Sequence, residues 1–171
     1  VPYVNYDFQN PRWERLKEAK LTYDPKSCSL TLRHQFPKSP VYLAWSPPYV
    51  GSDLERFLKK LPESRFWQVE SLGKSVEGRE MRLVTVTDKD IPDSGKRAIW
   101  IIAQQHGYEM AGGPICEGIV KSLLDEQQRE KLLQNFVFKL VPVMNPDAVA
   151  HGGFRYNMHD VDLNRNWDNQ V

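Results

Sequence analysis

The pattern of apolar and polar positions changes near residue 48. Within residues 28–45, leucines and other apolar residues alternate with polar or small ones, first as Leu30 and Leu32 and then as Val41, Leu43 and Trp45. This alternation predicts two short strands with a proline-containing turn between them, part of an antiparallel β-sandwich-like domain over residues 1–48. The prolines and glycine of SPPYVG then mark the domain boundary.

Beyond the boundary the pattern predicts alternating strands and helices. Ser52, with Glu55 three residues later, forms a capping box, so we expect Ser52 to be the N-cap of a helix. Residues 65–73 and 79–88 predict strands on either side of the turn KSVEG.

Residues 97–145 predict a strand, a helix and a second strand. The runs RAIWIIAQ and NFVFKLVPVMN are almost continuously apolar, which is typical of strands buried on both faces. Between them Pro114 suits a first helical turn, and several apolar residues share one helical face: Ile115, Ile119, Val120, Leu123 and Leu124. Strands joined in this way are parallel neighbours. We therefore expect an α/β fold over residues 49–171, with a mixed, largely parallel sheet and helices on both faces.

Charge and composition exclude several classes of protein. The 23 Lys and Arg residues are mixed with 22 Asp and Glu residues, so no basic stripe of the kind that nucleic acids require is present. No apolar run reaches the length of a membrane helix, and the first residues lack the segments of a signal peptide. Cys28 and Cys116 lie in different predicted domains, which favours free thiols and a cytoplasmic location. Nothing in the pattern indicates an oligomeric state.

Candidate chemistry follows the two buried strands, because α/β proteins place their sites at the carboxyl ends of such strands. His106 and Glu109, in QQHGYE, have the spacing of two ligands of a zinc ion. The alternative is a polar pair in a loop, since an H-x-x-D/E pattern arises easily by chance and His159 with Asp162 forms a second one.

The last forty residues concentrate arginine and asparagine, as Arg155, Asn157, Asn164, Arg165 and Asn166. Guanidinium and amide groups are suited to recognition of an anion such as a carboxylate. The alternative is that the arginines form surface ion pairs with nearby aspartates: Asp160, Asp162 or Asp168.

Four motifs together resemble one family. LGKSVEGREM, QQHGYE, NPDAVAHGGFRYN and DLNRNW, spread over about residues 66–168, are similar in order and spacing to the zinc metallocarboxypeptidases of the M14 family. The preceding segment, residues 28–54, resembles the junction between the β-sandwich domain and the peptidase domain in the cytosolic carboxypeptidase subfamily. The resemblance implies a carboxypeptidase-like fold, one Zn²⁺ ion per chain, and a peptide or protein C-terminus as the substrate.

The resemblance also implies roles for five residues. His106 and Glu109 match the first two zinc ligands, and Arg155 matches the arginine that stabilises the oxyanion of the tetrahedral intermediate. Asn164 and Arg165 match the pair that holds the free C-terminal carboxylate of the peptide. The subfamily further implies a preference for acidic C-terminal residues.

The third zinc ligand and the general base of the family have no counterpart in this sequence, so we expect residues 49–171 to be the N-terminal portion of a catalytic domain. His34, His151 and His159 do not stand in the context of the third ligand. Three alternatives remain open: a related zinc acylase acting on N-acyl amino acids, a non-catalytic module that binds C-termini, and a structural domain with a chance H-x-x-E.

Overall fold

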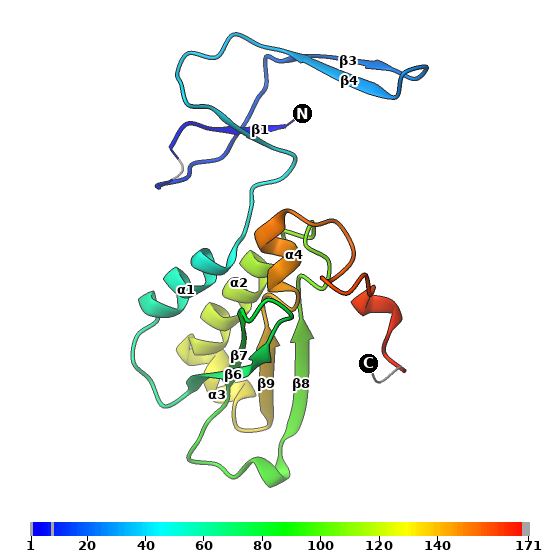
Figure 1. Cartoon of the computed structure of the whole chain (residues 1–171). Helices are drawn as coiled ribbons and strands as arrows, with labels where there is room; N and C mark the ends of the chain where they lie inside the picture. The colour runs from blue at the N-terminus through cyan, green and yellow to red at the C-terminus, as the bar shows by residue number, and fades with distance from the viewer. Residues whose placement is uncertain (1, 8, 169–171) are drawn as a thin grey trace. The chain divides into compact units, whose positions relative to one another are not determined.

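A computed structural model of the chain describes residues 2–7 and 9–168. The chain divides into two compact units, Val1–Pro48 and Tyr49–Val171, which are described separately (Figure 1).

The first unit contains two small antiparallel sheets. Their strands are β1 (Tyr3–Asn5), β2 (Glu14–Arg15), β3 (Lys20–Asp24), β4 (Ser29–Arg33) and β5 (Tyr42–Ala44). One sheet has the order β2-β1-β5, and the other is the hairpin of β3 and β4.

The two strands expected within residues 28–45 form as β4 and β5, but they do not pair with each other. The hairpin turn explains the difference, because Asp24 accepts hydrogen bonds from Lys26 N at 2.9 Å and from Ser27 Oγ at 2.7 Å. This tight turn makes β3 the nearer partner of β4, whereas β5 pairs with β1.

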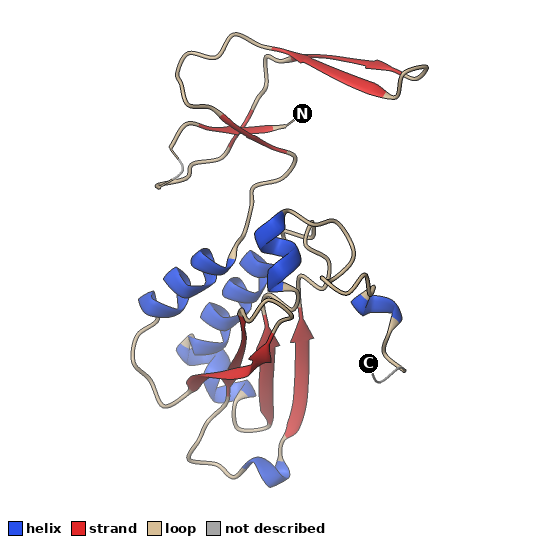
Figure 2. Ribbon diagram, in the orientation of Figure 1, coloured by secondary structure: helices blue, strands red, loops and turns tan. Residues whose placement is uncertain are grey.

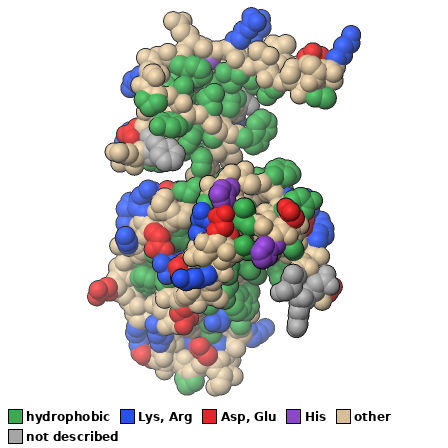
Figure 3. All heavy atoms as spheres, viewed as in Figure 1, with side chains coloured by type: hydrophobic (Ala, Val, Ile, Leu, Met, Phe, Trp, Pro, Cys, Tyr) green, Lys and Arg blue, Asp and Glu red, His purple; other side chains and the backbone are tan. Residues whose placement is uncertain are grey.

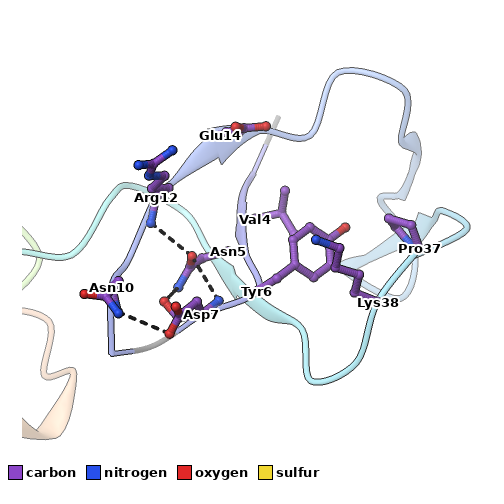
Figure 4. A pocket seen from close by; sticks show the side chains of 9 residues that line it. All are labelled: Val4, Asn5, Tyr6, Asp7, Asn10, Arg12, Glu14, Pro37 and Lys38. Carbon is purple, nitrogen blue, oxygen red and sulfur yellow. Dashed lines mark hydrogen bonds between the residues drawn. The ribbon is translucent and has the colours of Figure 1, made fainter.

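Asn5 closes a loop beside a hollow of about 560 Å³ in the first unit. Its Oδ1 accepts hydrogen bonds from Asp7 N and Arg12 N, and its Nδ2 donates to Asp7 O (Figure 4). The Asn5 side chain therefore satisfies backbone groups of the segment between β1 and β2, which forms no strand.

The second unit is built on a four-stranded sheet with the order β6-β7-β9-β8. The strands are β6 (Trp67–Lys74), β7 (Glu80–Val86), β8 (Arg97–Ile102) and β9 (Phe136–Val141). The pairs β6–β7 and β7–β9 are antiparallel, and β8–β9 is parallel, in register from Arg97 opposite Phe136 to Ile102 opposite Val141. The expected mixed α/β fold, with β8 and β9 as parallel neighbours, is confirmed, but β6 and β7 pair antiparallel, so the sheet is not largely parallel in the described residues.

Helices connect and cover these strands: α1 (Gly51–Lys60), α2 (Gly112–Leu124), α3 (Glu126–Leu132) and α4 (Pro146–His151), with short turns η1 (Asp93–Gly95) and η2 (Leu163–Arg165). α1, α2 and α3 lie on the same side of the sheet (Figure 2). There Leu54 and Val120 join Val84, Phe138 and Leu140 in one apolar core.

In the part of the chain that the structure describes, no helix is long and apolar enough to cross a bilayer.

The start of α1 differs from the expectation. Ser52 is not its N-cap; Val50 is, and Asp53 Oδ2 accepts a hydrogen bond from Val50 N at 2.9 Å. The reason is Tyr49, which is 5% exposed and whose hydroxyl donates to Glu117 Oε1 at 3.0 Å. Because this ring is packed into the core, the chain enters the helix directly after it.

The expectation that β8 is buried on both faces is wrong within the described residues. β8 lies at an edge of the sheet, beside β9 alone. Trp100 in its centre is 49% exposed, with Lys139 Nζ 5.5 Å from the centre of its ring. In this protein a continuous apolar run therefore belongs to a strand at the edge of the described sheet.

Candidate active site

The loop that follows β8 brings His106 and Glu109 together. The chain leaves the strand at Gln104, which has a φ of 48° and donates a hydrogen bond from its buried amide to Tyr49 O at 3.1 Å. Glu109 N then donates to His106 O at 3.2 Å and closes a turn. As a result, Nδ1 of the buried His106 ring and Oε1 of Glu109 lie 2.9 Å apart.

The other nitrogen of His106 contacts Asp162, 56 positions later in the sequence. His106 Nε2 and Asp162 Oδ1 are 2.9 Å apart. The second oxygen of the carboxylate, Oδ2, accepts a hydrogen bond from Arg155 Nε at 2.5 Å. A single aspartate, whose side chain is only 11% exposed, therefore joins His106 to Arg155.

These contacts shift the titration of all three groups. Hydrogen bonds to Asp162 and then to Glu109 raise the pKa of His106. Hydrogen bonds from His106 and then from Arg155 hold the pKa of Asp162 far below its usual value. The bond to Asp162 raises the pKa of Arg155 further. Asp162 and Arg155 are therefore both charged near neutral pH.

Asp162 also begins η2, the turn that carries Asn164 and Arg165. Asp162 Oδ1 accepts a hydrogen bond from Asn164 N at 2.9 Å, as an N-cap does. Asn164 Oδ1 accepts from Trp167 Nε1 at 3.2 Å, and the exposed Arg165 donates from Nη1 to Asn164 O at 2.8 Å. The two residues expected to bind a carboxylate thus stand on a turn anchored by the aspartate that holds His106.

Aromatic rings border His106. The Tyr108 and Phe154 rings stack with centres 4.2 Å apart and planes at 18°, although the two residues are 43% and 67% exposed. The His106 and Tyr108 rings are nearly parallel, with an angle of 8° between their planes and centres 6.0 Å apart. The loop after β8 and the loop after α4 therefore meet through their side chains as well.

Sequence reasoning did not single out Asp162 as a site residue. It considered Asp162 as a surface partner of an arginine or as the acidic partner of His159. The expected ion pair with an arginine forms, and the arginine is Arg155. The same carboxylate also contacts His106, whereas His159 is exposed. The signal for Asp162 in the sequence was its position two residues before Asn164, because an aspartate at such a position commonly caps a helical turn.

The donors fit part of a zinc site. Zinc in proteins accepts an imidazole nitrogen and a carboxylate oxygen, and a histidine ligand commonly donates its other ring N–H to a carboxylate. His106, Glu109 and Asp162 have this arrangement. Among residues 2–7 and 9–168, however, no group of three or more His, Cys, Asp or Glu side chains could hold a metal ion. His151, for example, contacts Glu77 Oε2 at 2.8 Å.

Charged side chains are interspersed over the visible face of the second unit (Figure 3). Lys and Arg groups lie next to Asp and Glu groups there, in keeping with the net charge of +1 for the whole chain.

Comparison with known proteins shows which family the chain resembles. The family model of zinc carboxypeptidases matches residues 54–171. Among individual proteins, cytosolic carboxypeptidase 6 of Mus musculus is 28% identical over 169 residues, a match that covers 92% of this chain and 31% of the mouse protein.

Solved structures give the same result. A metallo-carboxypeptidase from Burkholderia cenocepacia superposes with a TM-score of 0.83 and 30% identity, over 99% of this chain and 44% of that one. A Pseudomonas aeruginosa metallo-carboxypeptidase in complex with (2-guanidinoethylmercapto)succinic acid superposes with a TM-score of 0.82 and 27% identity, over 99% of this chain and 43% of that one. The chain thus spans less than half the length of each of these relatives.

Proposed function

Because this chain belongs to the zinc carboxypeptidase family, we propose that the complete protein is a zinc-dependent metallocarboxypeptidase that hydrolyses the C-terminal peptide bond of peptides or proteins. The observation that carries the proposal is the Asp162 carboxylate, which contacts both His106 and Arg155. It gathers a candidate metal ligand and a fixed cation at one point, as hydrolysis of an amide requires.

His106 and Glu109 are the two zinc ligands that this chain supplies. His106 Nδ1 and Glu109 Oε1 lie 2.9 Å apart, and they would be the two donors offered to zinc in place of the contact that they make with each other. Asp162 holds the His106 ring through Nε2 and leaves Nδ1 for the metal. The third protein ligand and the general base come from outside this sequence. When bound, zinc polarises the substrate carbonyl group and lowers the pKa of a bound water molecule.

Arg155 stabilises the oxyanion that forms when the peptide carbonyl group is attacked. Its Nε is engaged by Asp162, which fixes the plane of the guanidinium group in advance. A group that is already oriented needs no reorganisation when charge develops on the carbonyl oxygen.

Asn164 and Arg165 bind the free C-terminal carboxylate of the substrate. The exposed guanidinium group of Arg165 matches a carboxylate in charge and in planar geometry. Because Asp162 caps η2, these two residues keep a fixed relation to His106. A terminal carboxylate held in this way brings only the last peptide bond to the metal, which makes the enzyme an exopeptidase.

We further infer a cytoplasmic enzyme with a preference for acidic C-terminal residues. Both statements rest on similarity to the cytosolic carboxypeptidases, since the residues that read the last side chain are not identified in this chain. By the same similarity, residues 1–48 are a β-sandwich-like N-terminal domain and residues 49–171 the first part of the catalytic domain.

The test uses the full-length protein and matched peptides that end in glutamate or leucine, each with a free or an amidated C-terminus. We expect release of the last residue from the free acids only, faster for glutamate, with loss of activity after chelation and recovery with zinc. (2-Guanidinoethylmercapto)succinic acid, which is in complex with the Pseudomonas relative, is a compound to test for competition with the peptide substrate.

Other outcomes identify the alternatives. Hydrolysis of N-acyl glutamate without release from peptides indicates an acylase. Binding of C-terminal peptides without hydrolysis, with zinc present, indicates a recognition module. Peptide hydrolysis that persists after complete removal of the metal contradicts the proposal.

A further inference from the structure

Asn145 connects the two loops that carry the candidate site. It lies between β9 and α4, is 3% exposed, and caps α4 by accepting a hydrogen bond from Ala148 N to Oδ1 at 3.2 Å. Its Nδ2 donates to two backbone carbonyl groups, Gln105 O at 3.3 Å and Tyr156 O at 3.5 Å. The side-chain amide thus uses both of its N–H donors and its acceptor inside the protein.

The two carbonyl groups flank site residues. Gln105 immediately precedes His106, and Tyr156 immediately follows Arg155. Asp162 joins His106 and Arg155 through their side chains, and Asn145 joins the backbone beside each of them. The relative position of the candidate metal ligand and the candidate oxyanion arginine is therefore determined by two independent bridges.

Close backbone packing makes this relation sensitive to small changes. A Cβ atom at Gly107 would lie 2.4 Å from Gly153 O and 2.8 Å from Ala148 O, so the two loops are in contact without side chains between them. Gly153 N donates to Ala148 O at 2.6 Å, which holds the second loop on α4. A displacement of α4 is therefore transmitted to both loops, because no flexible side chain lies between them to absorb it.

We propose that Asn145 is a positioning residue, which sets the distance between His106 and Arg155 and so aligns the oxyanion-stabilising group with the metal. This inference rests on the proposed carboxypeptidase function. Asn145 acts through the two loops and does not itself touch the substrate.

The position requires an amide. Serine or aspartate at 145 would keep an acceptor for Ala148 N and so could still cap α4. Serine is too short to donate to two carbonyl groups, and aspartate would place a carboxylate oxygen against Gln105 O and Tyr156 O. Both variants lose the two N–H donors of the amide but keep an acceptor for Ala148 N, which separates positioning from helix capping.

The experiment measures peptide hydrolysis by the zinc-loaded full-length protein with Asn145→Ser and Asn145→Asp. We expect kcat to fall about 10- to 100-fold, because a misplacement of about 1 Å can cost that much, with KM changed less than about 2-fold. In a protein that already carries Arg155→Lys, either Asn145 substitution should lower kcat by less than about 3-fold further. The reason is that the Arg155 and Asn145 changes remove one shared function, the alignment of the oxyanion-stabilising group.

Asp125→Ala is the matched control, because Asp125 caps α3 through Gln127 N without contacting either loop. It should lower the melting temperature but leave kcat within about 2-fold of wild type. Equal effects of the Asn145 variants and the control on kcat, or full additivity with Arg155→Lys, would overturn the proposal.

Amide hydrogen exchange gives a second readout that does not depend on activity. Asn145→Ser should increase exchange at residues 104–109 and 152–157 together, and Asp125→Ala only around α3. If the wild-type protein releases no residue from any peptide, the proposed function fails, and unchanged exchange in these two loops would separately refute the role of Asn145.

Discussion

The carboxylate of Asp147 meets the guanidinium group of Arg79 across 68 positions of sequence, with Oδ1 2.7 Å from Nη1. Asp147 also accepts hydrogen bonds from Ser75 Oγ at 2.7 Å and from Glu77 N at 3.1 Å. Its side chain is 2% exposed. The turn between β6 and β7 is thereby tied to α4, the helix that precedes the loop of Arg155.

Asp147→Ala should destabilise the protein by about 2–4 kcal/mol, because it leaves three donors without their buried acceptor. Arg79 is 39% exposed and keeps Glu77 as a partner, which places the expected cost below that of a fully buried broken pair. Urea unfolding measures the change. As a control, Glu126→Ala, in a loose surface pair, should cost less than about 0.5 kcal/mol.

The pH dependence of stability provides a second test at Asp147. Burial raises the pKa of this carboxyl group, but hydrogen bonds from Ser75, Arg79 and Glu77 outweigh burial, and the folded-state pKa lies below the unfolded value. A lowered pKa stabilises the folded state above the unfolded pKa of about 3.9, and this stabilisation is lost as the pH falls through the folded pKa. The difference in unfolding free energy between wild type and Asp147→Asn should therefore be largest near neutral pH and shrink below about pH 4. A difference that grows on acidification would contradict the assignment.

Asp162→Asn tests the bridge between His106 and Arg155. We expect zinc affinity to fall about 10- to 100-fold, because the histidine ligand loses its charged partner, and kcat to fall with it. Competition with a chelator of known affinity measures the first effect in the full-length protein. Asp160→Asn, an exposed aspartate two residues away, should leave both quantities unchanged.

Zinc content distinguishes the two H-x-x-D/E patterns. Elemental analysis of the full-length protein should find about one zinc ion per chain, because three protein ligands and water complete a catalytic zinc site. His106→Ala should lose this zinc, whereas His159→Ala should keep it, since His159 is exposed and Asp162 is engaged by His106. Zinc retained in His106→Ala would remove His106 and Glu109 as ligands.

The two cysteines should react differently with a thiol reagent. Burial raises the pKa of Cys116 to about 11, so little of the reactive thiolate is present near neutral pH, and the side chain is 1% exposed. Cys28 is exposed. Mass spectrometry should find one label in the native 171-residue chain and two after unfolding; rapid native labelling of Cys116 would contradict its burial.

The β8–α2–β9 unit was predictable because two short apolar runs have the length of strands, and the apolar residues between them repeat with the period of a helix. The strands β1 to β3 were not predicted, because β2 and β3 are largely exposed and carry little hydrophobic pattern, and β1 has only three residues. The helix start at Val50 was missed for a different reason: the packing of Tyr49 overrode a favourable local capping pattern.

The candidate metal ligands could be predicted from their spacing within one loop, but the residues that hold them in place could not. His106 and Glu109 are three residues apart, whereas Asp162 reaches His106 across 56 positions and Arg79 reaches Asp147 across 68. Such contacts depend on how the strands are ordered in the sheet, which local pattern does not determine.

The close approach of Gly107 and Gly153 restricts how this protein can vary. A single substitution that adds a side chain at Gly107 meets the carbonyl group of a residue 46 places further along, so position 107 is constrained by a loop it does not belong to. A side chain at position 107 could be accommodated only if the backbone of Gly153 and of Ala148 moved, so tolerance at this one position is set by the loop after α4 and by α4 itself.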